Sequence, residues 1–249
     1  MPRFEAGTAV LRGDAAHHLG RVLRAEPGQL FELSDAESVW LARAERVGHD
    51  SIEFTLVEPL PAPVSRLRIT ILLSIVKFDR FEWALEKATE LGADEFVPLT
   101  AERSEKGLVS ATAKRAARWE KIIFEAAQQA RRLRVPALGK AAPPSRAFGG
   151  SPDGIRLLLS ERSGARPMRE VLGPNAQFVD EGKMLHVVLA IGPEGGWTDA
   201  EISAATAAGF SEISLGAAIL RTETAVCAAL AAVQYALGES RTPVEEAAP

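Results

Sequence analysis

Ile191-Gly-Pro-Glu-Gly-Gly-Trp-Thr-Asp-Ala-Glu201 is the stretch of sequence that decides the fold, because it begins where a long apolar run ends. That run, residues 185–191, is apolar or β-branched almost throughout, which is typical of a strand buried on both faces of a sheet. The glycines at positions 192, 195 and 196 allow positive φ and expose bare backbone amides, whereas Pro193 fixes one φ. We therefore predict a stiff loop that a ligand can approach closely.

A helix is predicted directly after this loop. Thr198 and Glu201 have the spacing of a capping box, so the helix should begin near Asp199 and run to Gly209, which suits a left-handed C-terminal cap. Strand, glycine-rich loop and helix, in this order, form the repeating unit of an α/β domain with a parallel sheet.

A second loop has the same organisation. Residues 210–215 predict a short strand, Gly216 interrupts it, and Thr222 or Thr224 can cap an alanine-rich helix that reaches residues 235–238. Two such loops side by side would form a pocket. By spacing alone, an equal alternative is that both are ordinary connections of an α/β domain. Neither loop has the pattern of a dinucleotide-binding or P-loop fingerprint.

A proline-rich segment, residues 58–65, disfavours both helix and strand pairing and therefore predicts a linker. The pattern before it is β-rich and fits a small barrel; the predicted strands are residues 29–33, 39–47 and 52–57. After it, strands alternate with helices, which predicts a parallel sheet. The predicted elements there are strands at 67–76, 96–99, 155–160, 185–191 and 213–215 and a helix over 81–91. We expect domains at residues 1–63 and 64–240, and a disordered tail at 241–249.

Composition indicates a soluble enzyme. The 249 residues are 47% hydrophobic, which is enough for a substantial core, and Cys227 is the single cysteine, in an apolar run where we assign it no chemistry. The sequence shows neither a secretory leader nor a run of about eighteen apolar residues, so we expect a cytoplasmic protein with no membrane association. His17 and His18 have no Cys or acidic partner at ligand spacing, so we expect no metal.

The net charge of −4 conceals two basic clusters. Residues 114–134 carry seven positive and two negative side chains, a local charge of +5, which would favour phosphates. On charge alone, a solvated helix face explains such a run more often. The second cluster comprises Arg3, Arg12, Arg21 and Arg24 with two histidines. A helix-like stretch over residues 14–24 would place Arg21 and Arg24 on neighbouring sites, so both clusters could follow one nucleic-acid backbone.

These motifs resemble, in order, those of one family. Residues 191–196 and 215–225, preceded by Glu82-Trp-Ala-Leu-Glu-Lys-Ala-Thr-Glu-Leu-Gly92 and Thr100-Ala-Glu-Arg-Ser104, resemble the RsmE family of 16S ribosomal RNA uridine-N3 methyltransferases in the SPOUT superfamily. The resemblance covers nearly the whole chain, because residues 17–28 are similar to the family's N-terminal domain. Two positions depart from the family pattern: Trp197 stands where Phe is usual, and Gln128 where Glu is expected.

The resemblance implies an N-terminal PUA-like RNA-binding barrel and a SPOUT domain with a deep trefoil knot, whereas connection rules alone predict an unknotted sheet. It also implies a homodimer packed through the last helix, S-adenosylmethionine as cofactor, and uridine 1498 of 16S ribosomal RNA as the target. The residues implied in cofactor binding are Gly192, Pro193, Glu194, Gly195, Gly196, Leu215, Gly216, Ile219, Leu220, Arg221, Glu223, Thr224 and Ala225. Those expected to bind RNA are Arg3, Arg12, Arg21, Arg24, Arg103, Lys114, Arg118 and Arg131.

Methylation at uracil N3 requires loss of the imide proton and stabilisation of negative charge on the flanking carbonyl oxygens. Arg221 is the first candidate for that stabilisation, and an ion pair with Glu223 or Glu194 is an equal alternative for it. Arg103 is a weaker candidate for positioning phosphate or base. Glu194 could accept a proton, but holding loop amides is the more frequent role of such a residue, so the general base is left unassigned.

Three classes of function remain open. The first is an S-adenosylmethionine-dependent RNA methyltransferase, the second an RNA-binding or ribosome-assembly protein without activity, and the third an α/β enzyme acting on a small nucleotide. The intact loops count against the second class. The basic N-terminal domain counts against the third, because an enzyme for a small molecule needs no second basic cluster.

Overall fold

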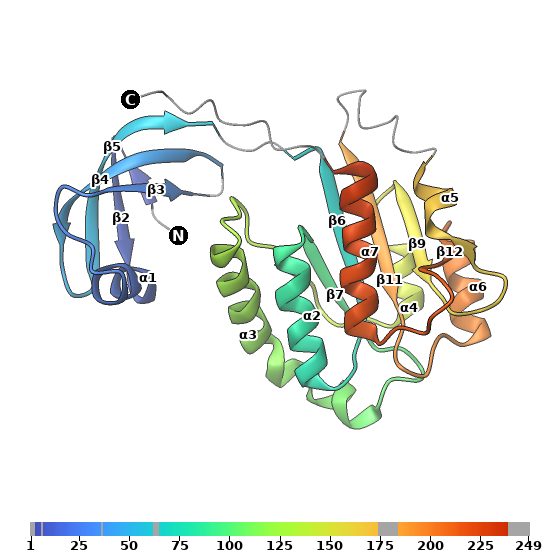
Figure 1. Ribbon diagram of the computed structural model, residues 1–249. Helices are drawn as coiled ribbons and strands as arrows, with labels where there is room; N and C mark the ends of the chain where they lie inside the picture. Colours follow the sequence, from blue (N-terminus) through green and yellow to red (C-terminus); the bar gives the residue numbers. More distant parts are fainter. Residues whose placement is uncertain (1–2, 6, 36, 62–64, 174–183, 239–249) are drawn as a thin grey trace. The chain divides into compact units, whose positions relative to one another are not determined.

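The computed structural model describes residues 3–5, 7–35, 37–61, 65–173 and 184–238. The chain divides into two compact units. The first comprises Met1–Val64 and Arg131–Val135, and the second Ser65–Ala130 and Pro136–Pro249. Figure 1 shows the elements of each unit. The tail predicted at 241–249 lies outside the described residues.

The first unit is an antiparallel sheet with the strand order β1-β2-β5-β4-β3. Its strands are β1 (Arg3–Glu5), β2 (Thr8–Arg12), β3 (Leu30–Ser34), β4 (Val39–Val47) and β5 (Ser51–Leu60). Side chains that alternate along the strands form a small core, in which Phe31 packs edge-on against Phe54 with their ring centroids 5.9 Å apart. The β-rich prediction is confirmed. Strands β1 and β2 were not predicted, because three to five residues give too little periodicity.

The helix-like stretch predicted over residues 14–24 is only partly helical. It consists of α1 (Asp14–His17) and one turn of π-helix, η1 (His18–Val22), and Arg24 follows with a φ of 52°. Because this left-handed conformation ends the helix, Arg21 and Arg24 do not occupy successive turns of one helix face. The expected pairing of these two arginines on one helix is therefore wrong.

The predicted linker is also shorter than expected. Strand β5 continues through Pro59, which pairs with Trp40 of β4. The pairing of β5 with β2 ends earlier, at Thr55, so Pro59 lies where β5 has a single neighbour and needs no donor on its other side. The central linker residues, 62–64, lie outside the described part.

The second unit is a seven-stranded parallel sheet with the order β10-β12-β9-β11-β6-β7-β8. Its strands are β6 (Leu67–Ser74), β7 (Glu95–Leu99), β8 (Ala137–Leu138), β9 (Ile155–Leu159), β10 (Arg166–Pro167), β11 (Leu185–Ile191) and β12 (Ser211–Ser214). Strand β11 lies at the centre between β9 and β6, and its residues 187–191 are buried. The apolar run that predicted a strand covered on both faces is therefore the middle of the sheet.

Helices cover both faces of this sheet. They are α2 (Phe78–Glu90), α3 (Lys106–Gln129), α4 (Pro144–Gly149), α5 (Met168–Leu172), α6 (Asp199–Ala207) and α7 (Thr222–Leu237). Figure 1 shows α2, α3 and α7 on the near face and α4 and α6 behind the strands. Behind the sheet, Phe148 of α4 and Ile202 of α6 pack on Leu72 and Val188. On the near face, α2 buries Phe81, Ala84, Leu85 and Ala88, the helical spacing that predicted it.

The predicted α/β architecture is confirmed, including the five strands and the three helices expected after the linker. The short elements β8, β10, α4 and α5 were not predicted, because a two-residue strand or a one-turn helix has no period to detect. Strand pairings do not by themselves show how the chain is threaded, so the trefoil knot stays a prediction. Among the described helices, none is long and apolar enough to cross a membrane.

Candidate active site at the carboxyl edge of the parallel sheet

The loops after the central strands leave the sheet at one edge, because all the strands run in the same direction. Ile191 pairs with Leu73, Ala190 with Leu158, and Ser74 with Leu99, so β11, β6, β9 and β7 end nearly level. In open parallel sheets, ligands bind in the crevice outside this carboxyl edge. The loops after β7, β11 and β12 contain most of the residues that the sequence singled out.

The loop after β11 has the predicted stiffness, but from one glycine of positive φ rather than three. The backbone N–H of Gly196 donates to the carbonyl oxygen of Pro193 at 2.8 Å, and Gly196 has a φ of +71°. Gly192 and Gly195 do not have positive φ, but a side chain at either position would press against a neighbouring residue. A Cβ at 192 would lie 3.0 Å from the ring of Trp197, and a Cβ at 195 would lie 3.2 Å from Cβ of Arg103.

The loop passes into α6 through the predicted capping box. Thr198 Oγ1 accepts from the backbone N–H of Glu201, and Glu201 Oε2 accepts from the backbone N–H of Thr198 at 2.9 Å. The other carboxylate oxygen of Glu201 accepts from the backbone N–H of Glu102 at 2.9 Å. The same side chain therefore also anchors the loop after β7.

Trp197, one of the two departures from the family pattern, is a structural residue here. Its indole Nε1 donates to the carbonyl oxygen of Leu159 at 2.9 Å, and its ring packs edge-on against Phe148. A phenylalanine at this position could fill the same space but could not donate this hydrogen bond. The departure thus adds a link between the loop and the end of β9. Gln128, the other departure, is exposed near the end of α3.

Arg103 lies at the site and binds the loop. Its Nη1 donates to the carbonyl oxygen of Gly195 at 2.7 Å, and the residue is exposed. The proposed role of Arg103 in positioning RNA stays a prediction, but its guanidinium already has one fixed partner in the loop.

The second loop, residues 215–221, is exposed from Gly216 onward, and Gly216 has a φ of +136°. Ile219 is 79% exposed and Leu220 is 36% exposed, although both were expected to enclose the cofactor. A fully exposed apolar side chain at a loop tip is typical of a surface that a ligand or a partner covers.

Thr222 joins the two loops instead of capping α7. The N-cap position is Arg221, and no side chain there bonds the helix terminus. The hydroxyl of Thr222 donates to the carbonyl oxygen of Gly192 at 3.2 Å. The predicted cap at Thr222 or Thr224 is therefore wrong, because this hydroxyl binds the neighbouring loop.

Arg80, which sequence reasoning missed, is the cation of this site. It lies in the first turn of α2 and forms ion pairs with Glu194 of the first loop and with Glu223, the latter at 3.8 Å between Nε and Oε1. Its side chain is 25% exposed, and that of Glu223 is 15% exposed. The remaining oxygen of Glu223, Oε2, is buried and has no hydrogen-bond partner among the described residues.

Arg221 is not paired with these glutamates. It is exposed at the start of α7, and its guanidinium makes no hydrogen bond or ion pair within the described part of the chain. The alternative that Arg221 serves an ion pair with Glu194 or Glu223 is therefore wrong, since both carboxylates bind Arg80. Arg221 is left available for a ligand.

The candidate RNA-binding residues are divided between the two units. Arg12, Arg21 and Arg24 are exposed on the first unit, and Arg3 lies in β1. Lys114 and Arg118 are exposed on α3, where Arg118 Nε also donates to Glu82 at 2.8 Å.

Arg131 follows the end of α3 with a φ of 51° and belongs with the first unit. The basic run 114–134 is therefore not one helix face.

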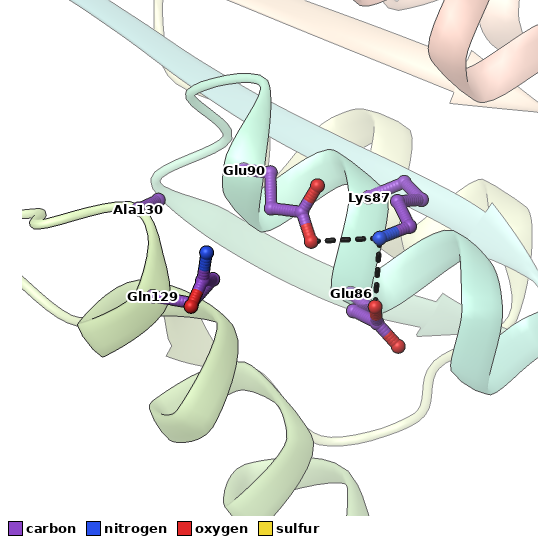
Figure 2. A pocket seen from close by; sticks show the side chains of 5 residues that line it. All are labelled: Glu86, Lys87, Glu90, Gln129 and Ala130. Atoms are coloured by element: carbon purple, nitrogen blue, oxygen red, sulfur yellow. Dashed lines mark hydrogen bonds and ion pairs between the residues drawn. The ribbon is translucent and has the colours of Figure 1, made fainter.

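A separate cavity of about 610 Å³ lies at the opposite end of α2 from Arg80. Glu86, Lys87, Glu90, Gln129 and Ala130 line it, and Figure 2 shows Lys87 Nζ between two carboxylates of its own helix, at 2.7 Å from Glu86 and 2.8 Å from Glu90. These carboxylates raise the pKa of Lys87 above its usual range. The described residues contain no group of three or more His, Cys, Asp and Glu that could hold a metal.

Comparison with known proteins identifies the family. The RNA methyltransferase domain family matches residues 63–234, more than half of the chain, and the RNA methyltransferase PUA domain matches residues 11–57. The chain belongs to the RNA methyltransferase family. Ribosomal RNA small subunit methyltransferase E of Synechocystis is 36% identical over 239 residues, 92% of this chain and 74% of the relative. The protein of that name from Bacillus subtilis is 30% identical, over 93% of this chain and 91% of the relative.

A solved structure of this methyltransferase family has the same fold. The crystal structure of ribosomal RNA small subunit methyltransferase E from Neisseria gonorrhoeae, bound to S-adenosyl methionine, superposes with a TM-score of 0.82 at 31% identity. The superposition covers 95% of this chain and 96% of that one. The predictions of a SPOUT-type methyltransferase domain and an N-terminal PUA-like domain are thereby confirmed.

Proposed function

We propose that the protein transfers the methyl group of S-adenosylmethionine to N3 of a uridine in 16S ribosomal RNA. The observation that carries this proposal is the joining of the two loops at the carboxyl edge of the sheet, through the hydrogen bond of Thr222 to Gly192, in a chain of the RNA methyltransferase family. The related Neisseria protein, similar over 95% of this chain, is bound to S-adenosyl methionine.

The two loops supply the groups that such a cofactor needs. Adenine requires apolar contacts on its faces and backbone donors and acceptors at its edges. Leu215, Ile219 and Leu220 offer the apolar contacts, and the backbone of the glycine-containing turns at 192–196 and 216 offers the polar ones. The remaining cofactor-binding candidates, Pro193, Thr224 and Ala225, lie within the same two segments.

Arg221 is the residue assigned to the uridine. As the N3 proton leaves, negative charge develops on the two flanking carbonyl oxygens, and a guanidinium without another partner can stabilise it. Arg221 meets this requirement because it is exposed beside the second loop and makes no ion pair among the described residues. Alignment of the uridine nitrogen, the methyl carbon and the sulfur in the bound complex would supply the remaining rate enhancement.

We also propose that the active form is a homodimer. Tyr235 on α7 is 94% exposed, Ile219 is 79% exposed, and Trp83 on α2 is 44% exposed. Helices α2 and α7 pack against each other, and Ile219 lies in the loop that precedes α7. A second copy would cover them and bring the second loop next to a partner chain. Light scattering after size-exclusion chromatography tests this: the wild type should be dimeric and Tyr235→Glu should shift towards monomer.

Calorimetric titration with S-adenosylmethionine tests the cofactor assignment first. Saturable binding with one site per chain is expected, and no detectable heat at millimolar cofactor would exclude the proposal and favour an RNA-binding protein without activity.

Mass spectrometry of 16S ribosomal RNA from a strain that lacks the gene then tests the target. Loss of 3-methyluridine, restored by the wild-type gene, is expected; an unchanged content would show that the methylated atom lies elsewhere.

A further inference from the structure

We propose that Arg80 is a positioning residue that holds the two cofactor loops in register through Glu194 and Glu223. This inference rests on the proposed function only where it assigns the loops to S-adenosylmethionine. Arg80 belongs to neither loop: it lies in the first turn of α2, which follows strand β6. Three segments that are distant in sequence therefore meet at one guanidinium.

We use the word brace for this arrangement, in which the single side chain of Arg80 binds Glu194 and Glu223 from two different segments. One carboxylate partner, Glu194, lies in the turn between β11 and α6, and the other, Glu223, lies in the first turn of α7. The planar guanidinium carries several donors in fixed directions, so it can bind two carboxylates at once where a lysine offers one mobile point charge. The hydrogen bond from Thr222 to Gly192 is a second, uncharged link between the same two loops.

Burial makes the loss of one partner more costly here than in a surface ion pair. The side chains of Arg80 and Glu223 are 25% and 15% exposed, whereas that of Glu194 is 49% exposed. Loss of the guanidinium would leave the most buried carboxylate, Glu223, without compensation, and such a group tends to move towards water. Movement of Glu223 would displace the start of α7 and the second loop.

Arg80 pairs with one of the two oxygens of Glu223. Oε1 faces Arg80, and Oε2 is buried without a hydrogen-bond partner in the described part of the chain. A buried carboxylate oxygen without a donor is costly, and a bound molecule with an ammonium or amide donor would satisfy it. S-adenosylmethionine and uracil both carry such donors. Arg80 acts on them through Glu223 and does not itself touch the reacting atoms.

Lys87 provides a matched control on the same helix. It too is a cation between two carboxylates, Glu86 and Glu90, and it is 32% exposed, close to the 25% of Arg80. Both partners of Lys87 belong to α2 itself, as Figure 2 shows. Substitution of Lys87 therefore breaks no contact between distant segments of the chain. Arg80→Gln and Lys87→Gln therefore remove the same kind of interaction, and only the first should affect the loops.

Hydrogen–deuterium exchange of the free full-length protein tests the brace without any ligand. Arg80→Gln should increase exchange in peptides that cover residues 192–197 and 215–224 together, by about tenfold in rate, and leave the central strand β11 protected. Lys87→Gln should leave both loops unchanged. Unchanged exchange in the loops of Arg80→Gln would overturn the inference, even if the wild type proved to bind no cofactor.

Cofactor titration and kinetics then separate positioning from general stabilisation. If the loops are held in the competent arrangement less often, the apparent Kd for S-adenosylmethionine should rise, by about tenfold if the competent fraction falls to about a tenth. Arg80→Lys, which restores charge but not the planar fork, should recover part of that loss. The double variant Arg80→Gln/Glu194→Gln should bind no more weakly than Arg80→Gln alone; additive losses would mean that Arg80 and Glu194 act independently and would contradict the brace.

The two proposals fail in different ways. No cofactor binding by the wild type would contradict the proposed function, whereas the exchange experiment would still test the brace. Normal binding and turnover by Arg80→Gln, with the wild type active, would contradict the brace and leave the proposed function intact.

Discussion

Glu201 and Glu102 are joined across 99 positions of sequence: Oε1 of Glu201 accepts a hydrogen bond from the backbone N–H of Glu102 at 2.9 Å. Because Oε2 of the same carboxylate completes the capping box of α6, one side chain, only 9% exposed, fixes the loop after β7 and the loop after β11. Two walls of the site therefore share a single anchor.

Glu201→Ala should lower the free energy of unfolding by about 3 kcal/mol, because it removes the cap of α6 and leaves the N–H of Glu102 without its acceptor. Urea denaturation of both proteins measures the difference. Asp199→Ala is the matched control on the same helix turn: Asp199 is 93% exposed and, among the residues that the structure describes, pairs only with the exposed Arg162, so its loss should cost less than about 1 kcal/mol. Equal losses would mean that the anchor has no special role.

Trp197→Phe should cost about 1 to 2 kcal/mol of stability, because the carbonyl oxygen of Leu159 loses its buried donor while much of the packing on Phe148 remains. Trp83→Phe, at a position that is 44% exposed, should change stability very little. Thermal unfolding followed by circular dichroism compares the two variants. A Trp197→Phe protein as stable as the wild type would show that the hydrogen bond is unimportant.

Arg221→Ala should reduce methyl transfer by about 100-fold or more with little change in melting temperature, because its guanidinium has no partner to lose in the described part of the chain. Transfer of a radiolabelled methyl group to 16S ribosomal RNA measures the rate, and the affinity for the cofactor serves as the control. Methyl transfer at the wild-type rate would remove Arg221 from the mechanism.

Gly195 and Gly196 should respond differently to substitution. At Gly196 the φ of +71° strains any other residue, so Gly196→Ala should cost about 1 to 2 kcal/mol of stability although a Cβ has space there. At Gly195 a side chain would press on Arg103, so Gly195→Val should chiefly weaken cofactor binding. Unfolding curves and titration calorimetry on both variants distinguish these effects; a Gly195→Val protein with unchanged cofactor affinity would show that the cofactor does not approach this turn.

Cys227 should be a poor nucleophile at neutral pH. Burial raises the pKa of its thiol above the ordinary value of 9.0, so the thiolate is scarce below that pH. Alkylation by iodoacetamide should be slower than that of free cysteine at every pH up to about 9. Faster alkylation than that of the free amino acid would contradict this description.

The raised pKa of the Cys227 thiol also has a consequence for stability. The free energy of unfolding should be unaffected by this thiol below pH 9.0 and should fall as the pH rises from there through the folded-state pKa.

Several elements and the cap of α6 could be predicted from the sequence, because their signals lie within a few residues of each other; the longest helix, α3, was not assigned as one. The apolar run that forms β11, the spacing of Phe81 and Leu85 in α2, and the box at Thr198 and Glu201 are all of this kind. The short elements β10 and α4 escaped because two residues of strand or six of helix repeat the period too few times to be recognised.

The contacts that assemble the site could not be predicted in this way. Arg80 lies in an ordinary amphipathic helix, and its partners Glu194 and Glu223 are more than a hundred positions away in the sequence. No local pattern therefore distinguishes Arg80 from other arginines. Thr222 has a good capping position, but in the folded unit its hydroxyl donates to the carbonyl oxygen of Gly192. Gly192 and Gly195 were correctly noticed, but neither has the positive φ suggested for it; a neighbouring side chain crowds each of them, and such crowding leaves no signature in sequence. Their part in binding a ligand stays a prediction.

The position of β11 has a consequence for folding of the chain during its synthesis on the ribosome. This strand is made late yet lies between two strands that are made earlier, β6 and β9, neither of which pairs with the other in the finished sheet. Until residue 191 has left the exit tunnel, the nascent chain therefore presents unpaired strand edges and lacks its centre. Such intermediates are prone to aggregate and need protection during synthesis. A chain that stops before residue 185 would be expected to be degraded rather than to persist as a partly active enzyme.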